Sequence, residues 1–71
     1  MDTATYTYDP LAELRVTTTV SVTRAAELLG IGRASAYNMA HDGRLPVINL
    51  GGSRFRVKSA ALLRMLEDSA A

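Results

Sequence analysis

The order of apolar and polar positions predicts four helices and one β-hairpin along the chain. The clearest helical period covers residues 22–29, where five apolar side chains fall on one face: Val22, Ala25, Ala26, Leu28 and Leu29. Ser21 is a preferred N-cap residue in front of this helix, and Gly30 ends it because glycine readily adopts positive φ. A second helix is predicted from about Arg33 to His41, and Gly43 ends it in the same way.

The two central helices are joined by a short turn, which is the arrangement of a helix-turn-helix unit. Ala26 is small enough for the helices to approach closely, and four side chains are expected where their inner faces meet: Leu29, Ile31, Ala36 and Met39. The helical period assigns the exposed outer face of the second helix to Arg33, Ala34, Tyr37, Asn38 and His41, with Ser35 at its edge. At this point the pattern fits a purely structural αα-hairpin as well as a DNA-binding unit. Tyr37 could belong either to the outer face or to the core.

Two short β-strands, residues 47–50 and 54–57, are predicted around the turn sequence Gly51-Gly52-Ser53. Alternation places Ile48, Leu50, Phe55 and Val57 on one face of this hairpin, and Val47, Asn49, Arg54 and Arg56 on the other. A glycine tip beside two arginines suits contact with a phosphate backbone or a minor groove. An arginine on an exposed strand is ordinary by itself, so the prediction depends on its combination with the helix pair.

The N-terminal segment predicts one further short helix. Asp9 and Pro10 form a helix start before Leu11 and Leu14, because aspartate caps well and proline suits the first helical position. The β-branched residues 16–20 predict an extended segment leading into the next helix. Residues 1–8 carry few core-forming side chains and predict a flexible arm.

The C-terminal segment predicts the last helix of a single domain, residues 9–68. Ser59 can cap this helix, whose apolar side chains are Leu62, Leu63, Met65 and Leu66. Most of these are expected in the core of so small a domain, while Met65 could remain exposed and contact a partner. Leu11 and Leu14 of the first helix could likewise lie in the core or contact a partner.

Composition narrows the classes of function. A chain of 71 residues allows one small domain, and the absence of cysteine favours a reducing, intracellular compartment. No apolar run approaches the roughly 18 residues that a membrane helix needs, so a cytoplasmic protein without membrane contact is expected. There is no phosphate-cradling loop with a lysine and no histidine–carboxylate set, and His41 is the only histidine. We therefore expect no enzyme activity, no cofactor, no metal and no small-molecule substrate, and a surface or phosphate-contacting role for His41.

The charges are unevenly distributed although the net charge is only +1. From Gly32 to Lys58 there is a single acid, Asp42, among five basic residues: Arg33, Arg44, Arg54, Arg56 and Lys58. The other acidic residues lie outside this stretch. One part of the molecule is therefore predicted to be basic, which favours an anionic partner. Considered alone, these charges fit a solvated surface of mixed charge equally well.

The segment SVTRAAELLGIGRASAYNMAHDGRLPVINLGGSRFRV, with the helix SAALLRMLE after it, resembles the small winged helix-turn-helix domains of the excisionase and MerR-like group. The likeness covers residues 20–67, and its specific parts are AAELLG in the first helix, RxSxY in the second, GRLP and the GG hairpin. The resemblance implies a mainly helical fold with a helix-turn-helix, a two-stranded wing, a C-terminal helix and, here, an extra short N-terminal helix.

The resemblance also implies which residues contact double-stranded DNA. Arg33, Ser35, Tyr37 and Asn38 would face the major groove or its flanking phosphates, with Ala34 and His41 on the same helix face. The wing would consist of Gly51, Gly52, Ser53, Arg54 and Arg56, and we assign further phosphate contacts to Arg24, Arg44 and Lys58. Two departures from the pattern reduce direct readout: Gly32 stands where a serine often caps the helix, and Ala34 and Ala36 offer no hydrogen bond to a base edge.

MerR-type activators attach this domain to a long dimerising helix and an effector domain, and this chain contains neither. The resemblance therefore favours a phage-type excisionase, a recombination directionality factor that acts in the cytoplasm on nucleoid DNA. Such a protein would load cooperatively on repeated attachment sites, bend the DNA and direct an integrase toward excision in site-specific recombination. The alternatives are a small MerR-like transcriptional regulator that binds promoter DNA, and an interaction module whose basic face binds an acidic protein.

Overall fold

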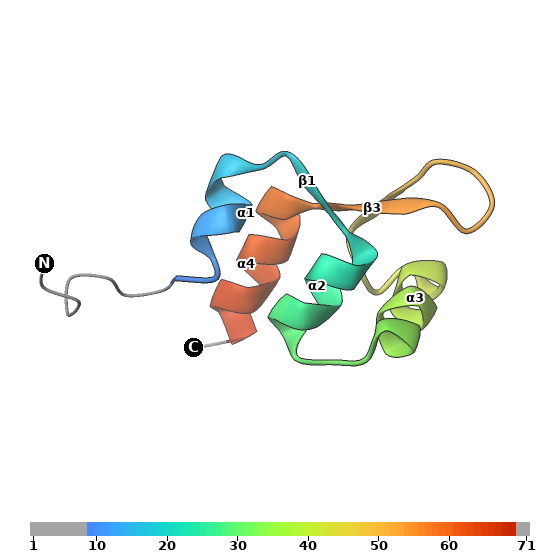
Figure 1. Cartoon of the computed structure of the whole chain (residues 1–71), viewed down its shortest axis with the longest axis horizontal. Helices are drawn as coiled ribbons and strands as arrows, with labels where there is room; N and C mark the ends of the chain where they lie inside the picture. Colours follow the sequence, from blue (N-terminus) through green and yellow to red (C-terminus); the bar gives the residue numbers. More distant parts are fainter. Residues whose placement is uncertain (1–8, 70–71) are drawn as a thin grey trace, which may run out of the picture.

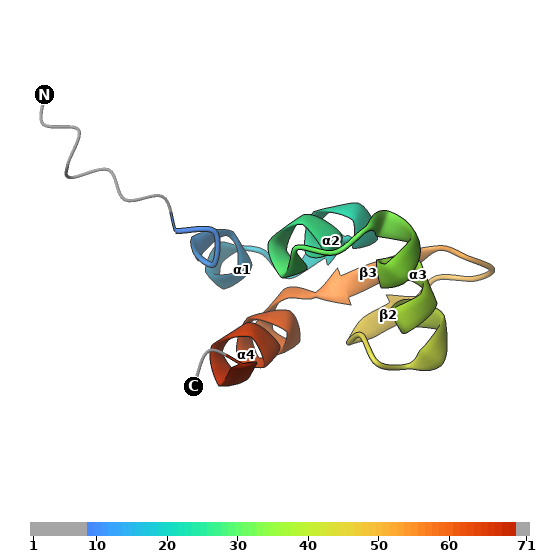
Figure 2. The same cartoon turned by 90° about the horizontal axis from the view of Figure 1, so that it is seen from below.

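The computed structural model describes residues 9–69, which form four helices and a three-stranded sheet (Figure 1). The elements are α1 (Ala12–Val16), β1 (Thr19–Ser21), α2 (Val22–Leu29), α3 (Arg33–Asp42), β2 (Val47–Asn49), β3 (Phe55–Lys58) and α4 (Ser59–Ser69). Two views agree in placing α3 and the β2–β3 turn at one end of the molecule and α1 and α4 at the other (Figure 2). The predicted fold class, mainly helical with a small sheet, is confirmed. The arm predicted at residues 1–8 lies outside the described residues.

Local signals set the bounds of the two central helices. The Ser21 hydroxyl accepts a hydrogen bond from the Arg24 backbone N–H at 3.0 Å, so Ser21 caps α2 as predicted. Gly30 ends α2 with φ at 74°, and Gly43 ends α3 with φ at 79°. Helix α2 has the predicted bounds, and α3 extends one residue beyond the predicted His41. Near the N-terminus, the Asp9 carboxylate accepts the Leu11 N–H at 3.0 Å, but regular helix begins only at Ala12.

The sheet contains one strand more than the predicted two-stranded wing. Its order is β1-β3-β2 with antiparallel neighbours, and Val20 of β1 pairs with Val57 of β3. The β-branched run therefore forms a strand as well as a connection. Its sequence predicts extended backbone, but its partner lies far along the chain and only the folded topology brings the two together.

The predicted faces of the hairpin were wrong. Residues that pair directly across antiparallel strands point to the same side of the sheet, and Ile48 pairs with Arg56 while Val47 pairs with Val57. Val57 is fully buried, and Val47 and Phe55 pack against the core, whereas Ile48 is exposed. Alternation determines which residues within one strand share a face, but the offset between two strands depends on the register.

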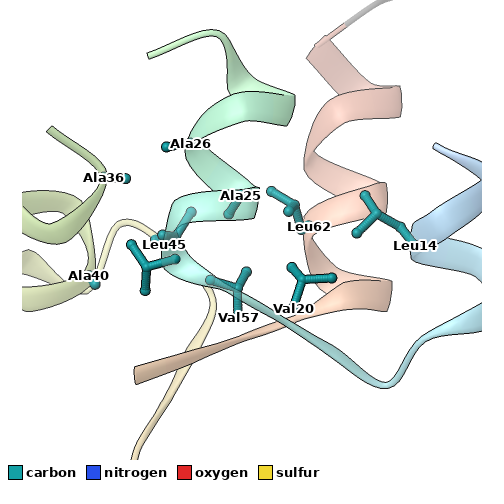
Figure 3. Close-up of a cluster of buried hydrophobic side chains, with 10 residues drawn as sticks. Leu14, Val20, Ala25, Ala26, Ala36, Ala40, Leu45, Val57 and Leu62 are labelled. Atoms are coloured by element: carbon teal, nitrogen blue, oxygen red, sulfur yellow. The ribbon is translucent and has the colours of Figure 1, made fainter. Parts of the chain in front are cut away.

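The core runs through the middle of the molecule and joins every helix to the sheet (Figure 3). Its buried apolar side chains are Leu14, Val20, Val22, Ala25, Ala26, Ala36, Ala40, Leu45, Val57 and Leu62. Leu14 lies beside Leu62, so α1 packs on α4 and does not leave Leu14 free for a partner (Figure 3). Met65, which the sequence left open for a partner, is half-buried against the core. The four alanines are small enough for α3 to pack closely on α2.

Ser59 has a different role from the predicted cap. It is the first residue of α4 and completely buried, and its hydroxyl is hydrogen-bonded to the Thr17 hydroxyl at 2.8 Å. The Ser59 backbone N–H donates to the Thr18 carbonyl at 3.0 Å. These bonds join the start of α4 to the segment between α1 and β1. Within residues 9–69, no helix is long and apolar enough to cross a membrane.

Candidate nucleic-acid interface

Helix α3 presents a polar outer face to solvent. Ala36 and Ala40 are buried against the core, which turns the opposite side of the helix outward. The side chains predicted on this face that are exposed are Arg33, Ala34, Ser35, Asn38 and His41, and Asp42 at the end of the helix is exposed as well. Tyr37 is half-buried and packs against the core, so both interpretations of this residue hold in part. The first six residues of α3 therefore carry three exposed side chains that can hydrogen-bond, Arg33, Ser35 and Asn38.

The N-terminus of α3 has no side-chain cap. Gly32 occupies the N-cap position and has no side chain, and its carbonyl accepts the Ala36 N–H at 3.1 Å. The backbone N–H groups of a first helical turn lack partners within the helix and lie at the positive end of the helix dipole. Arg33 is exposed next to them. This end of α3 therefore favours a nearby anion such as a phosphate.

The wing, which we define as β2, β3 and the turn between them, has a hydrogen-bonded tip. Gly51 and Gly52 both adopt positive φ, 112° and 57°, which side chains other than glycine rarely allow. The Asn49 side-chain oxygen accepts the Gly51 N–H at 2.8 Å, and the Arg54 N–H donates to the Gly51 carbonyl at 3.0 Å. Sequence reasoning assigned Asn49 only to a strand face and missed this role, although an asparagine side chain often hydrogen-bonds the backbone two residues farther along in a turn.

Arg56 and Lys58 lie on the outer face of β3, away from the core, as the pairing register requires. The Arg56 guanidinium donates to the Thr19 hydroxyl at 3.2 Å and to the Thr19 carbonyl at 3.4 Å. This pair of bonds directs the Arg56 side chain across β1. Arg54 is exposed beside the tip. The prediction that both wing arginines point outward is confirmed by their exposure.

A ring contact connects α3 to the wing. His41, in the last turn of α3, meets Phe55 of β3 edge to face, with ring centroids 4.9 Å apart. Phe55 is half-buried, so the contact is made from the inner face of the hairpin. The two exposed elements thus have a defined relative position. The sequence assigned Phe55 only to one face of the hairpin, and no sequence signal pairs it with His41.

The basic side chains differ in what they contact. Among residues 9–69, no carboxylate lies within ion-pair distance of Arg33, Arg54 or Lys58. Arg44 is exposed and bonded to Asp42 at 3.0 Å. A surface pair of this kind contributes about 0–1 kcal/mol, so Arg44 can exchange its partner for another anion.

Arg24 is held in ion pairs, and its predicted contact with phosphate stays a prediction. Its guanidinium donates to Glu13 at 2.7 Å and to Glu27 at 2.8 Å, so two carboxylates already neutralise it. It joins α2 to α1. We therefore assign Arg24 a structural role.

The acidic side chains concentrate at the end formed by α1 and α4. Arg15 of α1 pairs with Asp9 at 2.8 Å and with Glu67 of α4 at 3.5 Å. The hydrogen bond from Arg15, helped by the Leu11 N–H, holds the pKa of Asp9 below its ordinary value, and Asp9 in turn raises the pKa of Arg15. The described part of the chain is therefore acidic at one end and basic around α3 and the wing.

A glycine turn between two packed helices, followed by a β-hairpin beside the second helix, defines the winged helix-turn-helix class. Residues 19–70 match the sequence model of the helix-turn-helix domain family. The chain therefore belongs to this family of DNA-binding domains.

Two relatives from Mycobacterium tuberculosis, of strains CDC 1551 and H37Rv, are each 36% identical to the chain over 50 residues. Both have names that describe them as candidate DNA-binding proteins. The matched segment covers 70% of this chain and 63% of each relative, so the chain spans less than two thirds of their length. No solved structure matches the chain at a significant level.

Proposed function

We propose that the protein is an excisionase: it binds attachment-site DNA, bends it, and directs an integrase toward excision while the integrase performs all strand chemistry. The observation that carries this proposal is the combination of elements at one end of the molecule. There, a helix face with few base-reading groups lies beside a hairpin with unpaired cations. Such a surface holds the DNA backbone more strongly than it reads bases.

Helix α3 enters the major groove through its first turns. Arg33 and Asn38 are the exposed side chains able to make bidentate contacts with base edges, each worth about 1–3 kcal/mol of discrimination. Ser35 adds a weaker donor, Tyr37 is half-buried, His41 lies in the last turn of the helix, and Ala34 offers only a methyl group. Because these contacts are few, the shape and bendability of the DNA supply part of the specificity.

The wing and the start of α3 bind phosphates. Arg54, Arg56 and the Gly51-Gly52-Ser53 tip contact the backbone beside the minor groove, and Lys58 extends this row along β3. The uncapped N–H groups at the start of α3 bind a further phosphate together with Arg33. Arg44 contributes by exchanging Asp42 for phosphate.

Protomers load side by side on closely spaced direct repeats. A single module of this size buries on the order of 600–1,000 Å² on DNA, so one copy binds weakly and selects poorly. Contacts between neighbours add affinity and selectivity through multivalency. Each protomer bends the DNA slightly, and bends that face the same side of the double helix combine into a large one. The elastic cost of this bending is roughly 1–6 kcal/mol.

The test combines a bending assay with a recombination assay. On circularly permuted fragments carrying the attachment site, gel mobility of the complex is expected to depend on the position of the site. In a reaction with integrase, the protein is expected to raise the ratio of excision to integration. The double variant Arg33→Ala/Asn38→Ala should lose both effects. Arg64→Ala should retain both, because Arg64 is an exposed arginine of α4 at the other end.

Mobility that is independent of site position, together with an unchanged ratio, would reject the excisionase proposal. Specific binding without either effect would instead favour a small transcriptional regulator that recognises promoter DNA. Failure to bind any DNA, with binding to an acidic protein, would favour an interaction module.

A further inference from the structure

Two large apolar side chains are exposed on the outer face of the wing. In residues 9–69, the exposed large apolar side chains are Val16, Ile48 and Leu50, with exposures of 83%, 40% and 53%. Ile48 lies in β2 and Leu50 directly follows it, two positions along the same extended segment, so the two side chains share one face. Val16 lies in α1 at the other end of the molecule.

Each of these two side chains lies opposite an arginine. Ile48 pairs directly with Arg56. The register continues to Leu50 and Arg54, because the Leu50 N–H donates to the Arg54 carbonyl at 2.8 Å. Leu50 is therefore held by a backbone bond immediately before the glycine tip. The outer face of the wing carries an apolar row beside a basic row.

A partner for this face must accept apolar atoms and cations together. A purely apolar protein surface would leave Arg54 and Arg56 buried without counter-charges, which is costly. The minor groove of DNA provides both environments, since phosphates line its rims and apolar sugar edges and base steps lie within it. Proteins that bend DNA insert leucine, isoleucine or similar side chains between base steps from this groove.

We propose that Leu50 is an apolar wedge that enters the minor groove and partly unstacks a base step, while Arg54 and Arg56 bind phosphates on the rims. This inference rests on the proposed function and names the residue that produces the bend. Gly51 and Gly52 carry no side chains, so the tip can approach the groove closely and bring Leu50 with it. Ile48 lies two residues farther from the tip on the same face and adds to the apolar contact with the minor groove.

The experiment measures the DNA bend at saturating protein. It uses the full chain and a fragment with a single binding site selected by the parent protein, with dyes at both ends for energy transfer. Leu50→Ala is expected to reduce the bend by about 20° or more, since wedges kink DNA by roughly 20–90°. Val16→Ala, which also removes an exposed apolar side chain, is expected to bend DNA as the parent does.

Two further variants separate the wedge from other roles. The salt dependence of binding is expected to be unchanged in Leu50→Ala, because no phosphate contact is lost, whereas Arg54→Ala lowers the slope by about 1. Leu50→Met keeps the apolar bulk and should keep the bend. Thermal melts verify that each variant is folded, and if Leu50→Ala fails to fold, Leu50→Gln replaces it with a polar side chain of similar size.

Equal bending by the parent and Leu50→Ala, or by the parent and Leu50→Gln where it replaces Leu50→Ala, would overturn the wedge while leaving the proposed function in place. The wedge would also be overturned if Leu50→Ala bent a single site normally but lost cooperativity between adjacent sites, since Leu50 would then contact a second copy of the chain. A parent protein that leaves the DNA straight would contradict both the wedge and the proposed function.

Discussion

His41 and Phe55 meet edge to face, with ring planes at 87°, and this contact joins the end of the helix that we place in the major groove to the wing. An aromatic pair in this geometry contributes about 0.5–1.5 kcal/mol beyond burial of its area. The distance between the two elements that we propose contact DNA therefore depends on a pair of side chains that come from separate parts of the sequence.

Replacement of His41 should show whether its main role is this contact. His41→Phe keeps an aromatic edge against Phe55 and is expected to bind DNA within about twofold of the parent, whereas His41→Ala frees the wing and should bind about 2- to 10-fold more weakly. Titration of labelled DNA measures both affinities. Equal losses in the two variants would assign His41 to a direct phosphate contact instead.

DNA binding should weaken as salt increases. If about four phosphates are neutralised per protomer, the logarithm of affinity should fall with the logarithm of salt concentration at a slope of roughly −3 to −4. Fluorescence anisotropy over a range of KCl concentrations measures the slope. Arg64→Ala should keep it, and an affinity that does not change with salt would contradict the assigned phosphate contacts.

The helix and the wing should differ in how they affect specificity. Arg33→Ala or Asn38→Ala is expected to weaken the preferred site more than random DNA, because these side chains reach base edges. Arg54→Ala and Arg56→Ala should weaken both by similar factors, because phosphates carry no sequence information. Competition binding with both DNAs measures the ratio. If all four variants lose affinity uniformly, α3 does not read sequence.

The turn between the two central helices should depend on Gly30. Its φ of 74° strains any residue with a Cβ, although open space surrounds the position, so Gly30→Val should lower the free energy of unfolding by at least about 1–2 kcal/mol. Thermal or urea unfolding measures the change. Gly32→Ser is the matched control: its φ of −71° allows a side chain, and a serine cap on α3 should stabilise by a few tenths of a kcal/mol. A Gly30→Val protein that melts like the parent would contradict the assigned strain.

Close packing of α2 on α3 should be sensitive to volume at Ala36, which is completely buried. Ala36→Leu is expected to destabilise by about 1–3 kcal/mol because the core has no space for the added atoms. Ala34→Leu adds the same volume on the exposed face and should stay within about 0.5 kcal/mol of the parent. Urea unfolding compares the two, and equal effects would mean that the helices tolerate separation.

The sequence by itself determined the features that depend on neighbouring residues. Ser21, Gly30 and Gly43 set the helix ends because caps and positive φ act within a single turn of the chain. The helical period likewise predicted the exposed face of α3, and the GG signal predicted the hairpin. These local signals were enough to indicate the class of domain and most of its candidate DNA-contacting residues.

Only the tertiary structure decided features that join distant segments. It added β1 to the sheet, moved Ile48 and Leu50 to the outer face, paired Arg24 with Glu13 and Glu27, and placed His41 against Phe55. Strand register and ion pairing depend on which segments meet in space, and alternation or charge along one segment does not contain that information. The candidate DNA-contacting residues can therefore be listed largely from the sequence, whereas their relative positions come from the packed core.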